Sequence, residues 1–352
     1  MRVKKILAMI LAGALCVSAF TGCGINKNAT AATMKDRTVT LGMANFYCRY
    51  QQASVEDYYK SMLGGGDDFW STDLFGYGTT MEEDMKDSAM EALHEMYTLQ
   101  AHMDEYNVAL TDEEKASITE AAKKFMEANS KDAINEMGAS QEIVEELLTL
   151  FTIKDKMQTA IEAGADTNVS DAEANMRAYS MVTISTGDYQ DESGNTVEYT
   201  DEEKTKLKET AEKMEEELKE EDATLDSVAK AHDYEVTTGT YASDDENLDE
   251  DVKKALDALK EGETSALVET ADALYFVRID KETDEEATES NRQSIIETRK
   301  SDLYTEVLEG WQEKDEWEVD EKAMAKISFK NSLTQQDPNA STETEEVQST
   351  ES

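Results

Sequence analysis

The residue types that most often carry chemistry are scarce in this chain. It has three histidines. His94 and His102 are eight residues apart on one predicted helix, about two turns, so they could share a face. No cysteine or carboxylate array accompanies them at metal-ligand spacing, so a structural or surface role fits them better than metal binding. His232 follows a short predicted helix. The helix dipole favours a histidine at that position, so no chemical role is needed to explain it.

Two other groups invite a chemical reading. The acidic run from Asp244 to Asp251 lacks the sixth-position glycine of an EF-hand loop, so a solvated helix start explains it better than calcium. Cys48 lies on a helical face predicted to be buried, and no nucleophile and base stand at a recognisable spacing. The sequence therefore predicts no metal or other cofactor and argues against a hydrolase.

Cys23 is the one cysteine placed for chemistry. A basic head with Arg2, Lys4 and Lys5 precedes an uncharged run from Ile6 to Phe20. This order is typical of a secretory leader, and the run is shorter than the roughly 20 residues of a membrane span. Cysteine directly after a small residue resembles a bacterial lipobox, which implies cleavage before Cys23 and lipidation of its thiol; Phe20 departs from the usual leucine. An ordinary secreted protein with a chance cysteine is the alternative.

The charge of the chain limits its partners. The 352 residues carry a formal charge of −45, and without residues 1–22 there remain 31 Lys and Arg against 79 Asp and Glu, or −48. Such a chain repels phosphate backbones, which excludes nucleic acid, and does not lie flat on anionic lipid. We therefore expect the protein to contact the membrane only through the lipid attached to Cys23. With Cys23 modified, Cys48 is left alone, and no intramolecular disulfide can form.

Periodicity and capping signals divide the chain into segments. Met43, Phe46, Tyr47 and Tyr50 make one apolar helical stripe, and a capping box begins at Thr111. After a second capping box, the alternation from Tyr179 to Ser185 indicates a strand. The expected organisation is a leader at 1–22, a tether at 23–37, a helical domain at 38–170, an α+β domain at 178–282, a closing helix at 283–330 and a disordered tail at 331–352.

Two features of the helical regions bear on binding. The late apolar residues within 285–329 have no other nearby surface to bury against, so we expect this segment to pack on residues 40–170. The aromatic loop at 69–77 and the 17 methionines are material that promiscuous binding surfaces use, although methionines more often fill cores.

The α+β segment carries motifs of a known family. Residues 259–268, Leu-Lys-Glu-Gly-Glu-Thr-Ser-Ala-Leu-Val, are similar to the parvulin pattern L-x-x-G-E-x-S-x-x-V, with Gly262 at a helix end. Residues 223–230 resemble the family's D-F-x-x-L-A-K helix. With the order of segments, these motifs make the chain resemble PrsA-type foldase lipoproteins, relatives of the chaperone SurA that carry a parvulin (rotamase) domain. The resemblance implies a mostly α protein with an inserted α+β parvulin-like domain and a SurA-like N-terminal helical domain completed by a C-terminal helix.

The resemblance also points to a peptide groove and to a loss within it. Parvulins that isomerise prolyl bonds use two groove histidines; Met181 and Tyr275 stand at the matching positions. Leu248 and Val252 correspond approximately to the apolar shelf, and Tyr241 closes what remains of a glycine loop. We interpret these five residues as an apolar peptide groove without efficient catalysis, and assign no catalytic residue.

Two functions from different classes remain open. The first is a lipid-anchored foldase or chaperone that binds newly exported polypeptides on the outer face of the cell membrane. The second is a lipid-anchored scaffold or assembly protein that uses the same fold for one dedicated partner. The number of partners would distinguish them.

Overall fold

The chain forms two compact units in the computed structural model. The first comprises the residues before 166 and after 299, and the second comprises Asp166–Arg299. The structure describes residues 15–17, 25–35, 37–63, 68–190, 194 and 196–335. The predicted leader other than 15–17, Cys23, and the tail beyond 335 lie outside the described residues. No described helix combines the length and apolar character that crossing a bilayer requires.

The first unit is a helical array with short strands at its edges. Its hairpin of β2 (Thr30–Met34) and β3 (Arg37–Thr40) pairs with β10 (Glu318–Val319), whereas β11 (Leu333–Gln335) pairs with β1 (Leu15–Val17). Its helices are α2 (Leu41–Leu63), α3 (Met81–Ala101), α4 (Asp112–Ala128), α5 (Lys131–Met137), α6 (Gln141–Glu162) and α12 (Glu321–Met324), with 3-10 turns η1 (Phe69–Ser71) and η2 (Met103–Tyr106).

Local capping explains where several helices begin. At the start of α4, the backbone N–H of Glu114 donates to the Thr111 hydroxyl at 3.2 Å, and the N–H of Thr111 donates to the Glu114 carboxylate at 2.8 Å. The same reciprocal pair opens α8 (Asp201–Glu217) at Thr200 and Glu203. Each pair satisfies amides that have no partner inside the helix, so the capping box predicted at Thr111 is confirmed. At the second predicted box, before β4, the Ser170 hydroxyl accepts from the N–H of Glu173 at 3.2 Å, which is one half of such a pair.

The first unit is completed by residues from the end of the chain. In α11 (Glu285–Gln312), the part after residue 299 packs against α3 and α6, and the segment to Leu333 joins the main core. Residues 285–299 belong to the second unit, so only the later part of the predicted segment covers the helices. The apolar side chains that α11 contributes are Leu303, Tyr304, Val307, Leu308 and Trp311.

Two predicted boundaries of the first unit are wrong. Ala31, Ala32 and Met34, placed in a polar tether at 23–37, are buried in the main core as part of β2. Leu333, placed in a disordered tail from 331, is fully buried in β11. The described parts of these segments, β2 and β11, pair with strands far away in the sequence, which local composition does not indicate.

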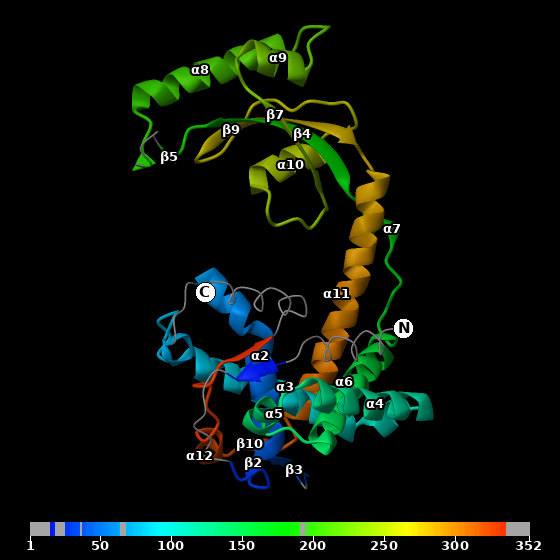
Figure 1. The fold of residues 1–352 in the computed structure, drawn as a ribbon. Coiled ribbons are helices and arrows are strands. Elements are labelled where there is room, and N and C mark those ends of the chain that lie inside the picture. Colours follow the sequence, from blue (N-terminus) through cyan, green and yellow to red (C-terminus); the bar gives the residue numbers. More distant parts are fainter. Residues whose placement is uncertain are drawn as a thin grey trace, which may run out of the picture. The chain divides into compact units, whose positions relative to one another are not determined.

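The second unit is a four-stranded antiparallel sheet with helices on both faces. The strand order is β7 (Val236–Tyr241), β4 (Arg177–Ser185), β9 (Ala273–Lys281) and β8 (Val268–Glu269). In Figure 1, α8 and α9 (Leu225–Ala231) cover one face and α10 (Glu250–Ala258) lies on the other. A short α7 (Asp171–Ala174) precedes β4, and β5 (Tyr189–Gln190) pairs with β6 (Thr196–Val197). The unit is wider than the predicted 178–282.

A mostly helical chain with an inserted α+β unit is the predicted fold class, which is confirmed. One detail differs. Gly262 was expected to end a helix, but α10 ends at Ala258. Gly262 instead adopts a φ of 83°, which glycine tolerates without steric cost, and its N–H donates to the Ile279 carbonyl at 2.7 Å.

Candidate functional site

The α10 face of the second unit brings together the two residues predicted to stand at the positions of the groove histidines. Met181 in β4 is opposite Val277 in β9, and Thr183 is opposite Tyr275. Side chains two residues apart in a strand share a face, so Met181 and Tyr275 are diagonal neighbours, about 7–8 Å apart by the usual sheet spacing. Both are half-buried and pack on the same core cluster.

The other three groove candidates belong to that cluster, but two of them are covered. Leu248 is half-buried and packs against it. Tyr241 and Val252 are each only 1% exposed. A client cannot touch side chains that are buried in the core, so the prediction that Tyr241 and Val252 line an open groove is wrong. They support the face from beneath, and Met181, Leu248 and Tyr275 are its accessible members.

Tyr241 is held by a polar network that the sequence did not reveal. Its hydroxyl accepts a hydrogen bond from Arg177 at 2.9 Å and donates one to the Asp257 carboxylate at 3.0 Å. Arg177 also donates to the carbonyls of Leu256 and Leu259 at 3.0 and 2.6 Å, which fixes the end of α10. Burial and the bond to Asp257 raise the pKa of Tyr241 to about 12, so it stays protonated at neutral pH.

Gly239, two residues before Tyr241, has a structural role within the sheet. It lies in β7 directly opposite Tyr179. A Cβ at this glycine would stand 2.7 Å from the Tyr179 hydroxyl, closer than real side chains approach. The glycine therefore lets the Tyr179 ring lie across the strand, where it makes an edge-to-face contact with Tyr241 at 5.9 Å. Gly239 and Tyr241 therefore both lie in the strand β7, and Tyr241 is also part of the core.

The histidines lie elsewhere and have structural partners. His94 stacks on Trp317 at 4.5 Å, and His102 stacks on Trp311 at 4.1 Å between ring centroids. The Nε2 atom of His232 lies 2.9 Å from a Glu217 carboxylate oxygen. Among the described residues, no group of three or more His, Cys, Asp or Glu side chains is arranged to hold a metal. The acidic run provides Asp249, whose carboxylate caps α10 by accepting from the N–H of Asp251 at 2.9 Å.

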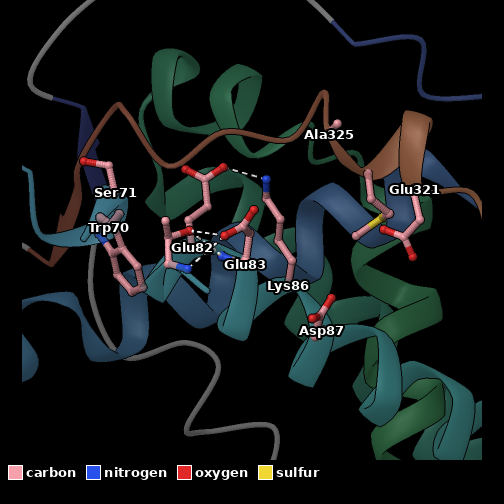
Figure 2. Close-up of a pocket in the computed structure, with 10 residues that line it drawn as sticks. Trp70, Ser71, Glu82, Glu83, Lys86, Asp87, Glu321 and Ala325 are labelled. Carbon is pink, nitrogen blue, oxygen red and sulfur yellow. Dashed lines mark hydrogen bonds and ion pairs between the residues drawn. The ribbon is translucent and has the colours of Figure 1, made fainter. Parts of the chain in front are cut away.

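A cavity of about 390 Å³ lies in the first unit, where α3 meets η1 and α12. Figure 2 shows Lys86 beside Glu82 on one wall. The Lys86 ammonium donates to Glu82 and to the Ile327 carbonyl, both at 2.5 Å, and Glu82 accepts from the N–H of Phe329 at 3.0 Å. The lining residues are Trp70, Ser71, Thr80, Glu82, Glu83, Lys86, Asp87, Glu321, Met324 and Ala325.

The cavity combines an aromatic wall with excess negative charge. Trp70 is buried, and its indole N–H has no acceptor among the described residues. Partial burial, followed by the nearby charge of Glu321, raises the pKa of Asp87. An aromatic wall beside carboxylates suits a cationic side chain. The spacing of Glu82 and Lys86 signals their ion pair, but nothing local in the sequence places α12 beside them.

An exposed aromatic loop follows the buried Phe69 and Trp70. The Asp73 carboxylate accepts from three backbone N–H groups, those of Gly76, Tyr77 and Gly78, at 2.7 to 3.1 Å. This fixes a turn from which Phe75 and Tyr77 project, 56% and 82% exposed and stacked on each other at 6.1 Å. Ordered, exposed aromatic residues of this kind are suited to binding apolar partners. The loop is therefore a second candidate surface.

The family comparison concerns the second unit. Residues 186–293 match the model of the PPIC-type PPIASE domain, the rotamase family of parvulins. The match confirms the resemblance drawn from residues 223–230 and 259–268. It begins after β4, so it includes Tyr275 and leaves Met181 outside.

Solved structures that match the chain include two foldase proteins and a chaperone. PrsA from Lactococcus lactis is 14% identical, with 85% of this chain and 97% of that chain covered at a TM-score of 0.33. PrsA from Streptococcus pneumoniae is 15% identical, with 86% and 99% covered at 0.30. A SurA-like chaperone of Campylobacter jejuni is 12% identical, with 84% and 100% covered at 0.29. None of the curated proteins compared with the chain matches it.

Proposed function

We propose that this protein is an extracytoplasmic, membrane-anchored foldase or chaperone that binds exported polypeptides. The observation that carries the proposal is the match of residues 186–293 to a PPIC-type PPIASE domain, which handles polypeptide substrates, inserted into a helical unit. The exposed pair Phe75 and Tyr77, and the half-buried apolar residues on the α10 face, supply surfaces for unfolded segments.

The location rests on the leader. A basic head, an apolar run and a cysteine after a small residue support export, cleavage before Cys23 and attachment of lipid to its thiol. One acyl chain binds membranes weakly, whereas several chains on one terminus anchor stably. Mass spectrometry of the N-terminus of the protein from its own cells tests this. An unmodified chain beginning at another residue would contradict it.

The α10 face is proposed to bind peptide without accelerating prolyl isomerisation. Rotation about the X-Pro bond has a barrier of about 18–20 kcal/mol, and lowering it needs polar groups placed against the amide. Met181 and Tyr275 replace the two groove histidines, and burial raises the pKa of Tyr275, which keeps its hydroxyl neutral. The remaining apolar surface can gain roughly 25 cal/mol per Å² that a client buries.

The experiment measures aggregation and isomerisation side by side. The chain from residue 24 to 352 is used, because ending it at 330 would delete the buried Leu333. We expect suppression of aggregation of an unfolded client, with X-Pro peptides exchanging at the background rate. Acceleration that Met181→Ala or Tyr275→Ala abolishes would overturn the assignment of a non-catalytic face, and no suppression would overturn the chaperone function.

Matched variants locate the binding surface. Replacing both Phe75 and Tyr77 by serine removes exposed rings, so we expect weaker suppression of aggregation at unchanged thermal stability. Tyr189→Ser is the control, because Tyr189 is also exposed but lies in the second unit. Equal suppression of aggregation by the two variants would show that the aromatic loop does not bind clients.

A further inference from the structure

The strand β11 has a partner that the proposed mature protein would lose. Leu333–Gln335 pairs antiparallel with Leu15–Val17, with Leu15 opposite Gln335, Cys16 opposite Thr334 and Val17 opposite Leu333. Leu333 is buried in the core of the first unit beside α2, and α5 lies alongside β1. Residues 15–17 fall inside the apolar run that precedes the predicted cleavage before Cys23. Cleavage would therefore leave this edge of β11 unpaired.

The direction of the backbone groups identifies which residue faces that edge. The N–H of Leu333 donates to the Glu56 carboxylate at 3.1 Å, on the side of α2. Backbone N–H and C=O groups of successive strand residues point to opposite edges. Those of Thr334 consequently point toward β1, where Cys16 is its direct partner, and those of Gln335 point away from β1.

We propose that the β11 edge, between the strand and α5, binds an extended apolar segment of an exported polypeptide by strand addition. In the uncleaved chain, residues 15–17 occupy this edge. The inference rests on the proposed export and names the mode of binding within the proposed function. An unpaired edge strand provides backbone donors and acceptors that accept an extended peptide of varied sequence.

The strand that pairs with β11 in the uncleaved chain indicates the chemistry of the segment that this edge binds. Its sequence is Leu-Cys-Val, uncharged and apolar, and it lies beside a strand whose Leu333 is part of the main core. A strand of three residues offers few backbone hydrogen bonds. Binding is accordingly weak and rapidly exchanging, which suits a protein that must release what it holds.

The first experiment measures binding of a defined peptide. The probe is a fluorescent peptide of residues 10–20 with Cys16→Ser, titrated by anisotropy into the chain from residue 24. Thr334→Pro removes the N–H that faces the site, and Gln335→Pro removes one that faces away. We expect at least tenfold weaker binding for Thr334→Pro and a change within about twofold for Gln335→Pro. Equal affinities of the two variants would overturn the proposal.

A second measurement leaves the protein unaltered, in case Thr334→Pro disturbs its folding. The probe is N-methylated either at position 16, whose N–H faces β11, or at position 17, whose N–H faces away. Loss of binding only for the peptide methylated at 16 supports strand addition, and equal binding of both peptides refutes it. The uncleaved chain should bind the probe at least tenfold more weakly than the chain from residue 24.

The outcomes separate this inference from the proposed function. Suppression of aggregation, together with peptide binding that Thr334→Pro does not weaken, would refute the β11 site but not the chaperone function. Binding that depends on residue 334 without any suppression of aggregation would support the site and refute the general chaperone function.

Discussion

Arg49 is expected to be the strongest single link between α2 and the end of the chain. Its guanidinium is 1% exposed and donates to the carbonyls of Ser328 and Asn331 at 2.8 and 2.6 Å. It also lies 3.3 Å from a Glu136 carboxylate oxygen. The perturbation is Arg49→Met, which keeps most of the apolar stem and removes every one of these donors.

The magnitude follows from what the substitution leaves behind. Hydrogen bonds to a charged group contribute about 1.5–3 kcal/mol each, and here two carbonyl acceptors lose their partner. Removing one member of a buried ion pair costs about 3–5 kcal/mol, because the remaining charge stays poorly solvated. Glu136 is partly exposed, so its cost is smaller. We expect the free energy of unfolding of the first unit to fall by about 3 kcal/mol.

The assay uses tryptophan fluorescence during urea unfolding of the chain from residue 24. All three tryptophans, Trp70, Trp311 and Trp317, lie in the first unit, so their emission reports on that unit alone. This matters because a chain of two units need not unfold in one transition. Lys124→Met is the control: it breaks an exposed pair with Glu120 at 3.3 Å, a type of pair worth about 0–1 kcal/mol. Arg49→Met and Lys124→Met with the same midpoint would refute the reasoning.

Three further predictions concern single groups. Burial raises the pKa of the Cys48 thiol to about 12, so in the chain from residue 24 it should not react with a thiol reagent at pH 8 until urea is added; fast reaction in the folded state would contradict this. The raised pKa of Asp87 means that the folded carboxyl holds its proton to higher pH than the unfolded one. Its negative charge is therefore destabilising at neutral pH, and Asp87→Asn should raise stability there by about 0.2–0.5 kcal/mol, the size of a like-charge contact such as that with Glu321. The gain should vanish as the pH falls below the ordinary carboxyl value of 3.8, as melting temperatures at several pH values will show. Thr111→Ala and Thr200→Ala each remove a capping box and should cost about 1 kcal/mol. Tryptophan fluorescence should detect only the first, because Thr200 lies in the second unit, whereas circular dichroism should detect both.

The features that the sequence predicted well are those decided within a few residues. The capping pair of Thr111 and Glu114 spans three positions, and the alternation from Tyr179 to Ser185 indicates β4. Such patterns need no knowledge of the rest of the chain.

The features that it missed depend on distant partners. β2 becomes ordered partly because Thr33 pairs with Glu318, and Leu333 is buried because its backbone meets Glu56. The buried Tyr241 hydroxyl depends on Arg177 of another strand, which donates a hydrogen bond to it. None of these pairings leaves a periodic trace in the local sequence.

Because the second unit is inserted into the first, the two units complete their folding in a fixed order. The residues of that unit are contiguous, so it can fold before the residues after 299 are in place. The first unit must wait, because Gln52 donates to the carbonyl of Phe329, 277 positions later. Until then the apolar faces of α2, α3 and α6 lack their final cover. The host is thus finished after its insert, and during that interval its early helices expose apolar faces of the kind that the α10 face is proposed to bind.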